Sequence, residues 1–305
     1  MRIPLITSPR YQDVGRRKGG GGGGKGGGGK GSGKGGGGAN GSSGSGDFSG
    51  KTSKVPITGG SASGKSTATA YGYGGGKPET IPTGQLFAGR TAGGATRAQI
   101  YGTRMYGSGY PGYSGYGVAG RGFPFWFWPV VWGGSTSQYL NDSEYGDSFN
   151  TSRLGGPMAQ ANFISNHTGS TFHVLSDNST IGSLIHSIDT NCSSSLSSLS
   201  SKTPSPYNSS APGGAEPEQA IQYYRSSSIV LTLDGYNNSA TFDSNPNVTD
   251  SPLPSGVDTI LLNCLNYTIG QAAPLIDNAS SRYISPSCFG FASLAWLIWL
   301  LAHYA

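Results

Sequence analysis

The residues best suited to chemistry lie in one short stretch of the N-terminal third. Gly59 to Ser66 read GGSASGKS, which matches the phosphate-binding pattern G-x-x-x-x-G-K-[ST]. In a working loop of this kind, backbone N–H groups surround the phosphates of a nucleotide, and the lysine, here Lys65, binds the terminal phosphates. The pattern raises the hypothesis of a nucleotide-hydrolysing enzyme or a kinase.

The elements that must position such a loop are not indicated around it. The loop resembles that of the uridine-kinase family, but the resemblance covers this motif alone. A phosphate loop follows a buried strand and opens a helix whose N-terminus faces the anion. Pro56 interrupts the apolar segment before the motif, and three glycines at 74–76 follow too soon for a supporting helix. We interpret the match as a product of local composition and predict no cofactor.

Glycine and charge divide the chain into two regions. Of 305 residues, 53 are glycine and only 11% are charged, against about 7% and about 25% in typical proteins. Residues 1–122 carry a net charge of +13 and the remainder carries −8. The run from Arg16 to Gly38 has no apolar side chain to offset the entropy of ordering its backbone. Residues 1–100 are therefore predicted to form a disordered basic arm rich in Gly, Lys and Ser.

Two roles are open for this arm. It is either a solvated spacer or a segment that binds a polyanion such as an anionic wall polysaccharide. Nucleic acid is a less favoured partner because Arg-Gly pairs, which are typical of nucleic-acid-binding segments of this kind, are few. No small-molecule substrate is inferred.

Residues 101–151 form a Tyr/Gly-rich segment that ends in an aromatic run. Phe123 to Trp132 contains three Trp and three Phe within ten residues. The run is too short to span a bilayer, and Pro124 and Pro129 break any helix. It is either a wedge packed on the following domain or an adhesive aromatic patch for self-association, a membrane interface or sugar-ring stacking.

Glycosylation sequons give the most specific signal in the chain. The pattern N-x-[ST] occurs far more often between 141 and 280 than its Ser/Thr content explains, and lysine is nearly absent there. We predict that this region faces the secretory lumen. The predicted acceptors are Asn141, Asn150, Asn166, Asn178, Asn191, Asn208, Asn237, Asn247 and Asn266.

Residues 152–276 contain enough apolar sequence for a small α+β domain. Alternating and continuous apolar runs predict strands within 170–175, 226–242 and 257–269. Apolar residues at helical spacing predict a helix within 180–199, and Pro217 with neighbouring acids predicts a second helix within 215–227.

The cysteines fit an oxidising compartment. Cys192 and Cys264 lie inside the predicted domain, whereas Cys288 lies in the C-terminal tail. A disulfide between Cys192 and Cys264 would join the predicted helix to a predicted strand. The alternative, a metal site with the histidines of the domain, lacks ligand spacing, so no metal is predicted.

The C-terminus has the layout of a lipid-anchor signal. Small residues are followed by a polar spacer over 277–287 and a hydrophobic tail over 288–305, predicted to be helical. This order is typical of a glycosylphosphatidylinositol (GPI) anchor, with Asn278, Ser280 and Ser281 as attachment candidates. The alternative is a retained tail-anchor helix, for which the tail is barely long enough. Either arrangement makes the membrane a partner.

The N-terminus does not fit a GPI anchor. The first twenty residues lack the apolar core of a signal peptide, which a secreted protein requires. Either the start of the chain is misassigned, which the sequon excess favours, or the protein is tail-anchored with its sequons unused.

Several segments resemble known sequences. The runs FAGRTAGGATRAQIYGTRMYGSGYPG, GRGFPFWFWPVVWGG and QYYRSSSIVLTLDGYNNS, with the apolar tail, are similar to a group of glycine-rich GPI-anchored proteins of basidiomycete fungi. The resemblance covers about Phe87 to the C-terminus and implies no activity and no functional residues.

The sequence as a whole predicts a mostly disordered Gly-rich arm, a small α+β domain and a C-terminal hydrophobic helix. It favours a non-enzymatic glycoprotein of the cell surface or wall, structural or adhesive, on the outer side of the plasma membrane. The alternative is a single-pass tail-anchored protein. An enzyme is not predicted, because Asp189, Asp234, Asp243 and Asp258 form no recognisable pair and no nucleophile motif is present.

Overall fold

The computed structural model describes residues 51–59, 64–113, 117–133, 140, 143–208, 214–243 and 248–278. The chain divides into two units, Met1–Gly46 and Asp47–Ala305, and all described residues belong to the second. The first fifty residues of the predicted arm and the predicted C-terminal helix over 288–305 lie outside the described residues.

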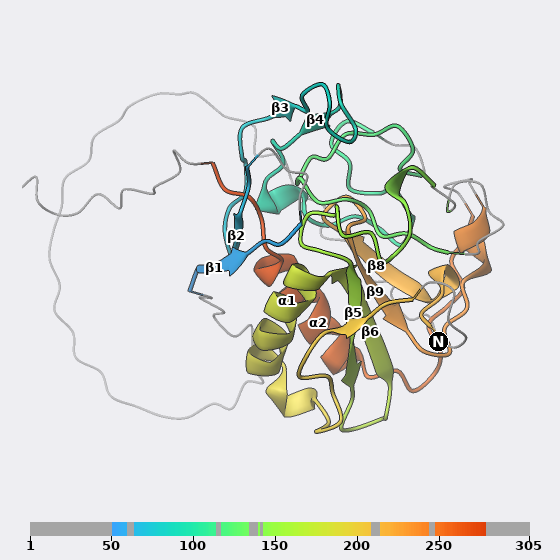
Figure 1. Ribbon diagram of the computed structural model, residues 1–305. Helices are drawn as coiled ribbons and strands as arrows, with labels where there is room; N and C mark the ends of the chain where they lie inside the picture. The colour runs from blue at the N-terminus through green and yellow to red at the C-terminus, as the bar shows by residue number, and fades with distance from the viewer. Residues whose placement is uncertain are drawn as a thin grey trace, which may run out of the picture. The chain divides into compact units, whose positions relative to one another are not determined.

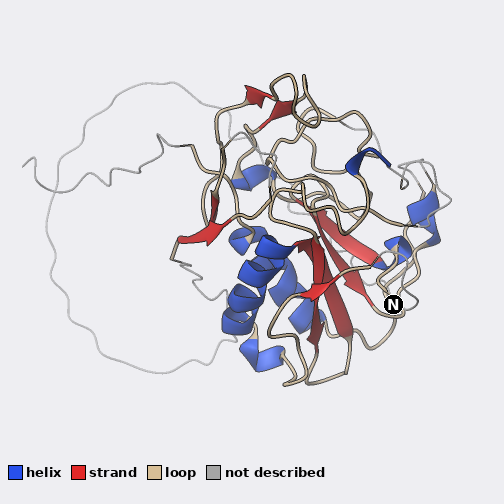
Figure 2. Ribbon diagram, in the orientation of Figure 1, coloured by secondary structure: helices blue, strands red, loops and turns tan. Residues whose placement is uncertain are grey.

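The centre of the second unit is an antiparallel sheet with the strand order β7-β5-β6-β9-β8 (Figures 1 and 2). Its strands are β5 (Met158–Ile164), β6 (Thr171–Asp177), β7 (Ser205–Pro206), β8 (Ala220–Tyr224) and β9 (Ile229–Leu233). Successive side chains of a strand point to opposite faces of the sheet. The three central strands, β5, β6 and β9, therefore place apolar side chains on both faces. The strands predicted within 170–175 and 226–242 are confirmed as β6 and β9.

Two helices cover one face of this sheet. They are α1 (Asn178–Asn191) and α2 (Thr259–Ala272), which pack side by side (Figure 1). Each begins at an aspartate: the Asp177 carboxylate accepts from the Thr180 N–H, and the Asp258 carboxylate accepts from the N–H groups of Ile260 and Leu261. Together with the sheet side that they cover, the two helices form what we call the helix-backed face.

Two sequence predictions inside this domain are wrong. The segment 257–269 was predicted as a strand but forms most of α2, because Asp258 caps it and Leu261, Leu265 and Ile269 line one helical face. The segment 215–227 was predicted as a helix. It forms a short 3₁₀ turn over Pro217–Gln219 and then β8, whose Tyr223 and Tyr224 are buried.

The opposite face of the sheet is covered mainly by the described residues between 51 and 133, which we call the glycine–aromatic layer. A few of its residues, Ala95, Ile100 and Phe125, join the core beneath the helices instead. Its short strand pairs are β1 (Ser53–Pro56) with β2 (Thr67–Ala70) and β3 (Glu79–Thr80) with β4 (Thr91–Ala92). The arm predicted over 1–100 is therefore wrong from β1 onward, and so is the boundary at 101. Side chains such as Ile57, Ala68 and Ile81 join one apolar core with those of the sheet, which offsets the cost of ordering this glycine-rich chain.

The aromatic run is the centre of this layer. Its six aromatic side chains between Phe123 and Trp132 are each at most 4% exposed. Trp132 donates its indole N–H to the hydroxyl of Tyr223 on β8 at 3.0 Å, and Tyr106 donates to the Val130 carbonyl at 2.5 Å. The packed-wedge interpretation is confirmed for this run, and the adhesive-patch interpretation is wrong, because the rings are not available at the surface.

Buried Arg225 joins the glycine–aromatic layer to the helix-backed face. Arg225, Ser226 and Ser227, between β8 and β9, all have positive φ angles of 49–60°. The guanidinium lies 3.5 Å from the ring centroid of Phe127 and forms an ion pair with Asp177 at 2.7 Å. It also donates hydrogen bonds to Ser228 Oγ, Thr180 Oγ1, Ser176 Oγ and the carbonyl of Pro274. Burial lowers the pKa of Arg225 to about 10, a shift that Asp177 opposes, so the side chain stays charged at neutral pH.

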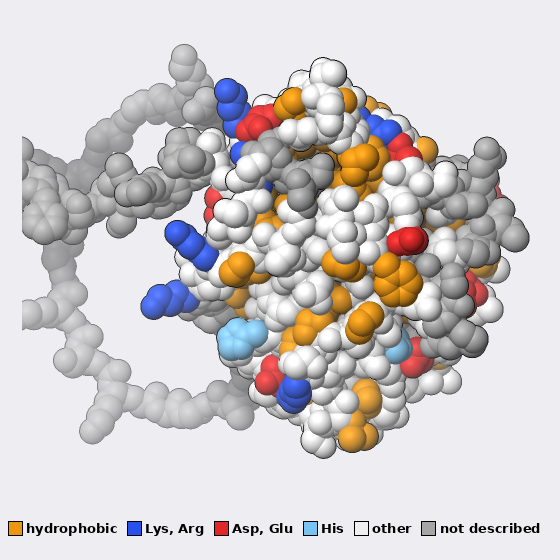
Figure 3. All heavy atoms as spheres, viewed as in Figure 1, with side chains coloured by type: hydrophobic (Ala, Val, Ile, Leu, Met, Phe, Trp, Pro, Cys, Tyr) orange, Lys and Arg blue, Asp and Glu red, His pale blue; other side chains and the backbone are white. Residues whose placement is uncertain are grey.

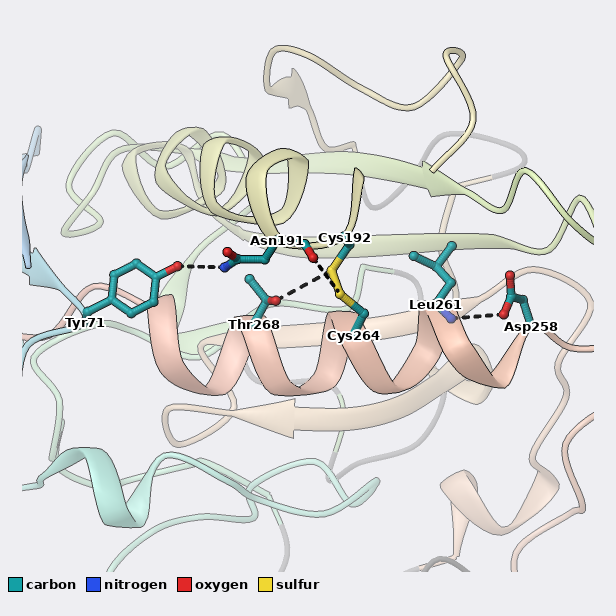
Figure 4. Close-up of a disulfide and its surroundings, with 7 residues drawn as sticks. All are labelled: Tyr71, Asn191, Cys192, Asp258, Leu261, Cys264 and Thr268. Atoms are coloured by element: carbon teal, nitrogen blue, oxygen red, sulfur yellow. Dashed lines mark hydrogen bonds between the residues drawn. A yellow bond between two sulfur atoms is a disulfide. The ribbon is translucent and has the colours of Figure 1, made fainter. Parts of the chain in front are cut away.

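The predicted disulfide is present within the helix-backed face (Figure 4). Cys192 follows α1 and Cys264 lies in α2, with an S–S distance of 2.00 Å. It joins helix to helix rather than helix to strand, because 257–269 is helical. Figure 4 also shows Asn191 donating its amide N–H to the hydroxyl of Tyr71 at 2.9 Å, a contact between the helix end and the glycine–aromatic layer.

Candidate functional site

The phosphate-loop motif lies in a β-hairpin. Gly59 follows β1, Lys65 and Ser66 precede β2, and residues 60–63 are outside the described residues. The Ile57 N–H donates to the Ser66 carbonyl at 3.0 Å, which closes the hairpin. The Lys65 ammonium forms an ion pair with Glu79 at 3.1 Å and lies 4.7 Å from the Trp126 ring centroid. A strand therefore follows the motif where a nucleotide site requires a helix.

The start of α1 lies beside this hairpin but does not offer an anion site. The Asn178 N–H donates to the Pro157 carbonyl at 3.0 Å, and the Ser179 N–H donates to the Gly155 carbonyl at 2.9 Å. The third N–H, from Thr180, is bonded to Asp177 at 2.9 Å. Because these N–H groups are already bonded and the cap is a carboxylate, this helix end does not favour a phosphate.

A surface cavity of about 490 Å³ lies in the glycine–aromatic layer. Much of its wall is backbone, because Gly89, Gly93, Gly94, Gly120 and Gly122 line it. A Cβ built on Gly89 or Gly120 would meet no atom within 4 Å. These two glycines leave room for a ligand to approach the main chain closely.

The side chains of the cavity are aromatic and polar. Tyr110 is 5% exposed, whereas Tyr113 is 65% exposed at the rim. The guanidinium of Arg121 lies 4.9 Å and 5.2 Å from the ring centroids of these two tyrosines and donates to the Gly107 carbonyl at 2.9 Å. The cation–π contacts join both rings to one guanidinium. Exposed Gln99 adds an amide to the same cavity.

Arg90 supplies charge to one wall of the cavity. Its guanidinium forms an ion pair with Glu144 and lies 4.8 Å from the Phe87 ring centroid. Burial raises the pKa of Glu144, but hydrogen bonds from Arg90 and the Gly120 N–H outweigh burial, so this pKa lies below its usual value. The hydrogen bond with Glu144 raises the pKa of Arg90. The pair fixes the wall and remains ionised across the neutral range.

The lining of this cavity combines aromatic rings, glycine backbone and polar side chains. Among the described residues that line it, none is Asp, Glu, His, Cys, Ser or Lys. Tyrosine rings present an apolar surface on which the C–H face of a sugar ring packs, while their hydroxyls, Gln99 and Thr91 can hydrogen-bond sugar hydroxyls. The sequence missed this cavity, because turns across 89–124 bring its residues together and no motif marks them.

The carboxylates considered for catalysis have separate structural roles. Asp258 caps α2 and accepts from Ser165 Oγ at 2.6 Å, and Asp189 pairs with Lys202 at 2.5 Å. Asp234 accepts from His173 at 2.7 Å, and the other ring nitrogen of His173 lies 2.8 Å from Asn162. Asp243 follows a 3₁₀ turn over Ser239–Phe242. In the described part of the chain, no three His, Cys, Asp or Glu side chains are grouped to hold a metal.

The described sequon asparagines fall into two groups. Asn166, Asn178, Asn208 and Asn237 are exposed, as is the attachment candidate Asn278. Asn150, Asn191 and Asn266 are half-buried, and the structure uses their side chains: Asn150 donates to the Tyr145 carbonyl, and Asn266 accepts from the Tyr224 hydroxyl at 2.7 Å. Asn141, Asn247, Ser280 and Ser281 lie outside the described residues.

Comparison with known proteins gives no relative. No protein-family model, curated protein or solved structure matches this chain. Within the described ranges, no helix has the length and apolarity needed to cross a membrane.

Proposed function

We propose that this protein is a non-enzymatic, wall-associated glycoprotein of the cell surface, which binds polysaccharide in the Tyr110–Tyr113 cavity. The observation that carries the proposal is an open cavity lined by two tyrosines that contact Arg121, by an amide and by glycine backbone, with no Asp, Glu, His, Cys, Ser or Lys among its described lining residues. The sequon excess supports the lumenal compartment, and the order of small residues, spacer and apolar tail supports attachment through the C-terminus.

A binding experiment tests the cavity. Full-length protein is titrated calorimetrically with neutral glucan, chitin and uronic-acid oligosaccharides, with wild type compared to Tyr113→Ala. We expect one class to bind and the variant to weaken it about tenfold, which corresponds to about 1.4 kcal/mol. Tyr73→Ala is the matched control, because Tyr73 is also 65% exposed but does not line the cavity. Equal loss in both variants, or no binding by wild type, would contradict the proposed site.

The compartment needs a separate measurement. Treatment of cell-made protein with N-glycosidase should increase its electrophoretic mobility. The Asn237→Gln variant, which lacks one acceptor, should show a mobility increase that is smaller by the contribution of one glycan. Asn263→Gln is the control, because Asn263 is also exposed but is not part of a sequon. An unchanged mobility of the wild type would favour the second candidate, a tail-anchored protein whose domain faces the cytosol.

A further inference from the structure

The C-terminal end of the described chain is fixed to the glycine–aromatic layer. Thr69 and Leu275 exchange two backbone hydrogen bonds, of 2.7 Å and 3.1 Å. The Gly74 N–H donates to the Asp277 carboxylate at 2.7 Å, and the Asn278 N–H lies 3.4 Å from the Gly74 carbonyl. The last described residues, which we call the exit, are therefore held at one defined place, beside β2 and the turn that follows it.

Three lysines and one tyrosine lie on the segments that flank this place, and the Asp277 carboxylate lies within it. Lys54 on β1 lies opposite Thr69 on β2, and Thr69 in turn forms an antiparallel bridge with Leu275. Lys54 is therefore two strand positions away from the segment that contains Leu275. Lys51, Lys54 and Lys77 are all exposed, and no described carboxylate forms an ion pair with them. Tyr73, next to Gly74, is 65% exposed. Figure 3 shows Lys and Arg side chains projecting along the edge that carries β1 and β2.

The distance to the predicted anchor is short. Ser280 and Ser281 follow Asn278 by two and three residues, which span at most about 10 Å of extended chain. That reach is close to the Debye length of about 8–10 Å at physiological ionic strength. Charges next to Asn278 are therefore within about one Debye length of the predicted point of attachment.

We propose that Lys51, Lys54, Tyr73 and Lys77, together called the exit face, lie against a membrane surface bearing anionic phosphate headgroups. The inference rests on the membrane attachment in the proposed function and adds the orientation of the domain. Lysine ammonium groups are attracted to any lipid headgroup with a net negative charge, and tyrosine is favoured at the boundary between headgroups and water. The polysaccharide cavity has a different lining, so the two surfaces are separable by mutation.

Hydrogen exchange on vesicle-bound protein tests the orientation. Full-length protein is reconstituted in phosphatidylcholine vesicles with and without phosphatidylinositol, and backbone exchange is followed over residues 52–56 and 72–77. We expect exchange in these segments to be severalfold slower in the anionic vesicles, and the protection to be lost in 0.5 M salt (about a 4 Å Debye length). The triple variant K51Q/K54Q/K77Q should abolish it.

Lys202→Gln is the control variant, because Lys202 is exposed but lies beside Asp189 and away from the exit. It should keep the protection, and both variants should keep the unfolding midpoint of the wild type. If the protein sediments with the vesicles but its backbone exchange is equal in both lipids, the proposed exit face is contradicted and membrane attachment is not. Failure to sediment with either vesicle would contradict membrane attachment itself, and the exit face with it.

Discussion

The two faces of one sheet are covered in different ways. The helix-backed face is built from two capped helices, and its side chains follow helical and strand periodicity. The glycine–aromatic layer consists mainly of turns, with short strand pairs and many glycines at positive φ. Even so, its large aromatic side chains are as buried as the aliphatic side chains beneath the helices.

The comparison shows that regular secondary structure is not required to cover a sheet. In the glycine–aromatic layer, aromatic rings provide the apolar area. Arginine side chains donate hydrogen bonds to backbone carbonyls that are not paired within a β-sheet. Arg97 donates to the carbonyls of Gly72, Gly270 and Ala273, at 2.9, 3.1 and 2.7 Å. It thereby binds the C-terminal end of α2, where a cation is favoured. Burial lowers the pKa of Arg97 to about 10.

The largest predicted effect is at Arg225, which connects the two faces. Arg225→Met should lower the free energy of unfolding by about 3–5 kcal/mol, because Asp177 is left buried and unpaired. Guanidinium unfolding can be followed by tryptophan fluorescence and by far-ultraviolet circular dichroism. Trp126, Trp128 and Trp132 lie in the glycine–aromatic layer, and none lies in α1 or α2. With Trp296 and Trp299, which lie outside the described residues, replaced by Phe in every protein compared, the two signals report different faces.

The two signals also test whether the faces form one cooperative unit. We expect the transitions to coincide in the wild type, with both shifted equally in Arg225→Met. Lys202→Ala, which breaks an exposed ion pair, should change stability by less than about 1 kcal/mol. Separate transitions in the wild type would show that the glycine–aromatic layer unfolds independently, contrary to the role given to Arg225.

A smaller effect is expected from the disulfide, which lies within one face only. Cys192→Ser combined with Cys264→Ser removes a cross-link between residues 72 apart and should cost about 2–4 kcal/mol. The loss should be measured by urea unfolding against wild type under non-reducing conditions. Wild type in reducing agent should behave like the double variant. If it does not, the difference comes from the serines rather than from the missing bond.

The sequence predicts the helix-backed face in part. The spacing of Ile181, Leu184, Ile185 and Ile188 identifies α1, and the two cysteines inside the predicted domain identify the disulfide. It misses α2, since a short apolar run such as Ile260 to Leu262 is compatible with a strand or a helix. The capping aspartate before that run, Asp258, was the available signal.

The glycine–aromatic layer is harder to predict for a physical reason. Its order comes from contacts between distant segments, such as Ala92 with Phe123 and Gly107 with Ser227, and not from local periodicity. The glycine content alone therefore predicted disorder over 51–100. In the structure, side chains of the sheet, which are distant in sequence, bury the apolar residues of this segment. The cavity was missed for the same reason, because turns rather than a motif bring Gln99 and Tyr113 to one place.

The smallest predicted effect compares Asp258, which caps α2, with Glu144, which pairs with Arg90 of the glycine–aromatic layer. Burial raises the pKa of Asp258, but hydrogen bonds from Ser165, Leu261 and Ile260 outweigh it, so the pKa lies below its ordinary value, as for Glu144. A lowered pKa in the folded state adds stability above the unfolded-state pKa of about 4, and this stability is lost as the pH falls through the folded-state pKa. Stability of the wild type should therefore decrease below about pH 4.

Asp258→Asn and Glu144→Gln should each flatten part of this decrease. Asparagine remains a good helix cap, so the loss at pH 7 should be at most about 1 kcal/mol for Asp258→Asn. The loss should be smaller for Glu144→Gln, because this ion pair is about one quarter exposed. Urea unfolding between pH 3 and pH 7, read by the two spectroscopic signals, measures both slopes. If the faces are coupled, each variant changes the slope of both signals, whereas a change confined to one signal would mean that each face carries its own acid sensitivity.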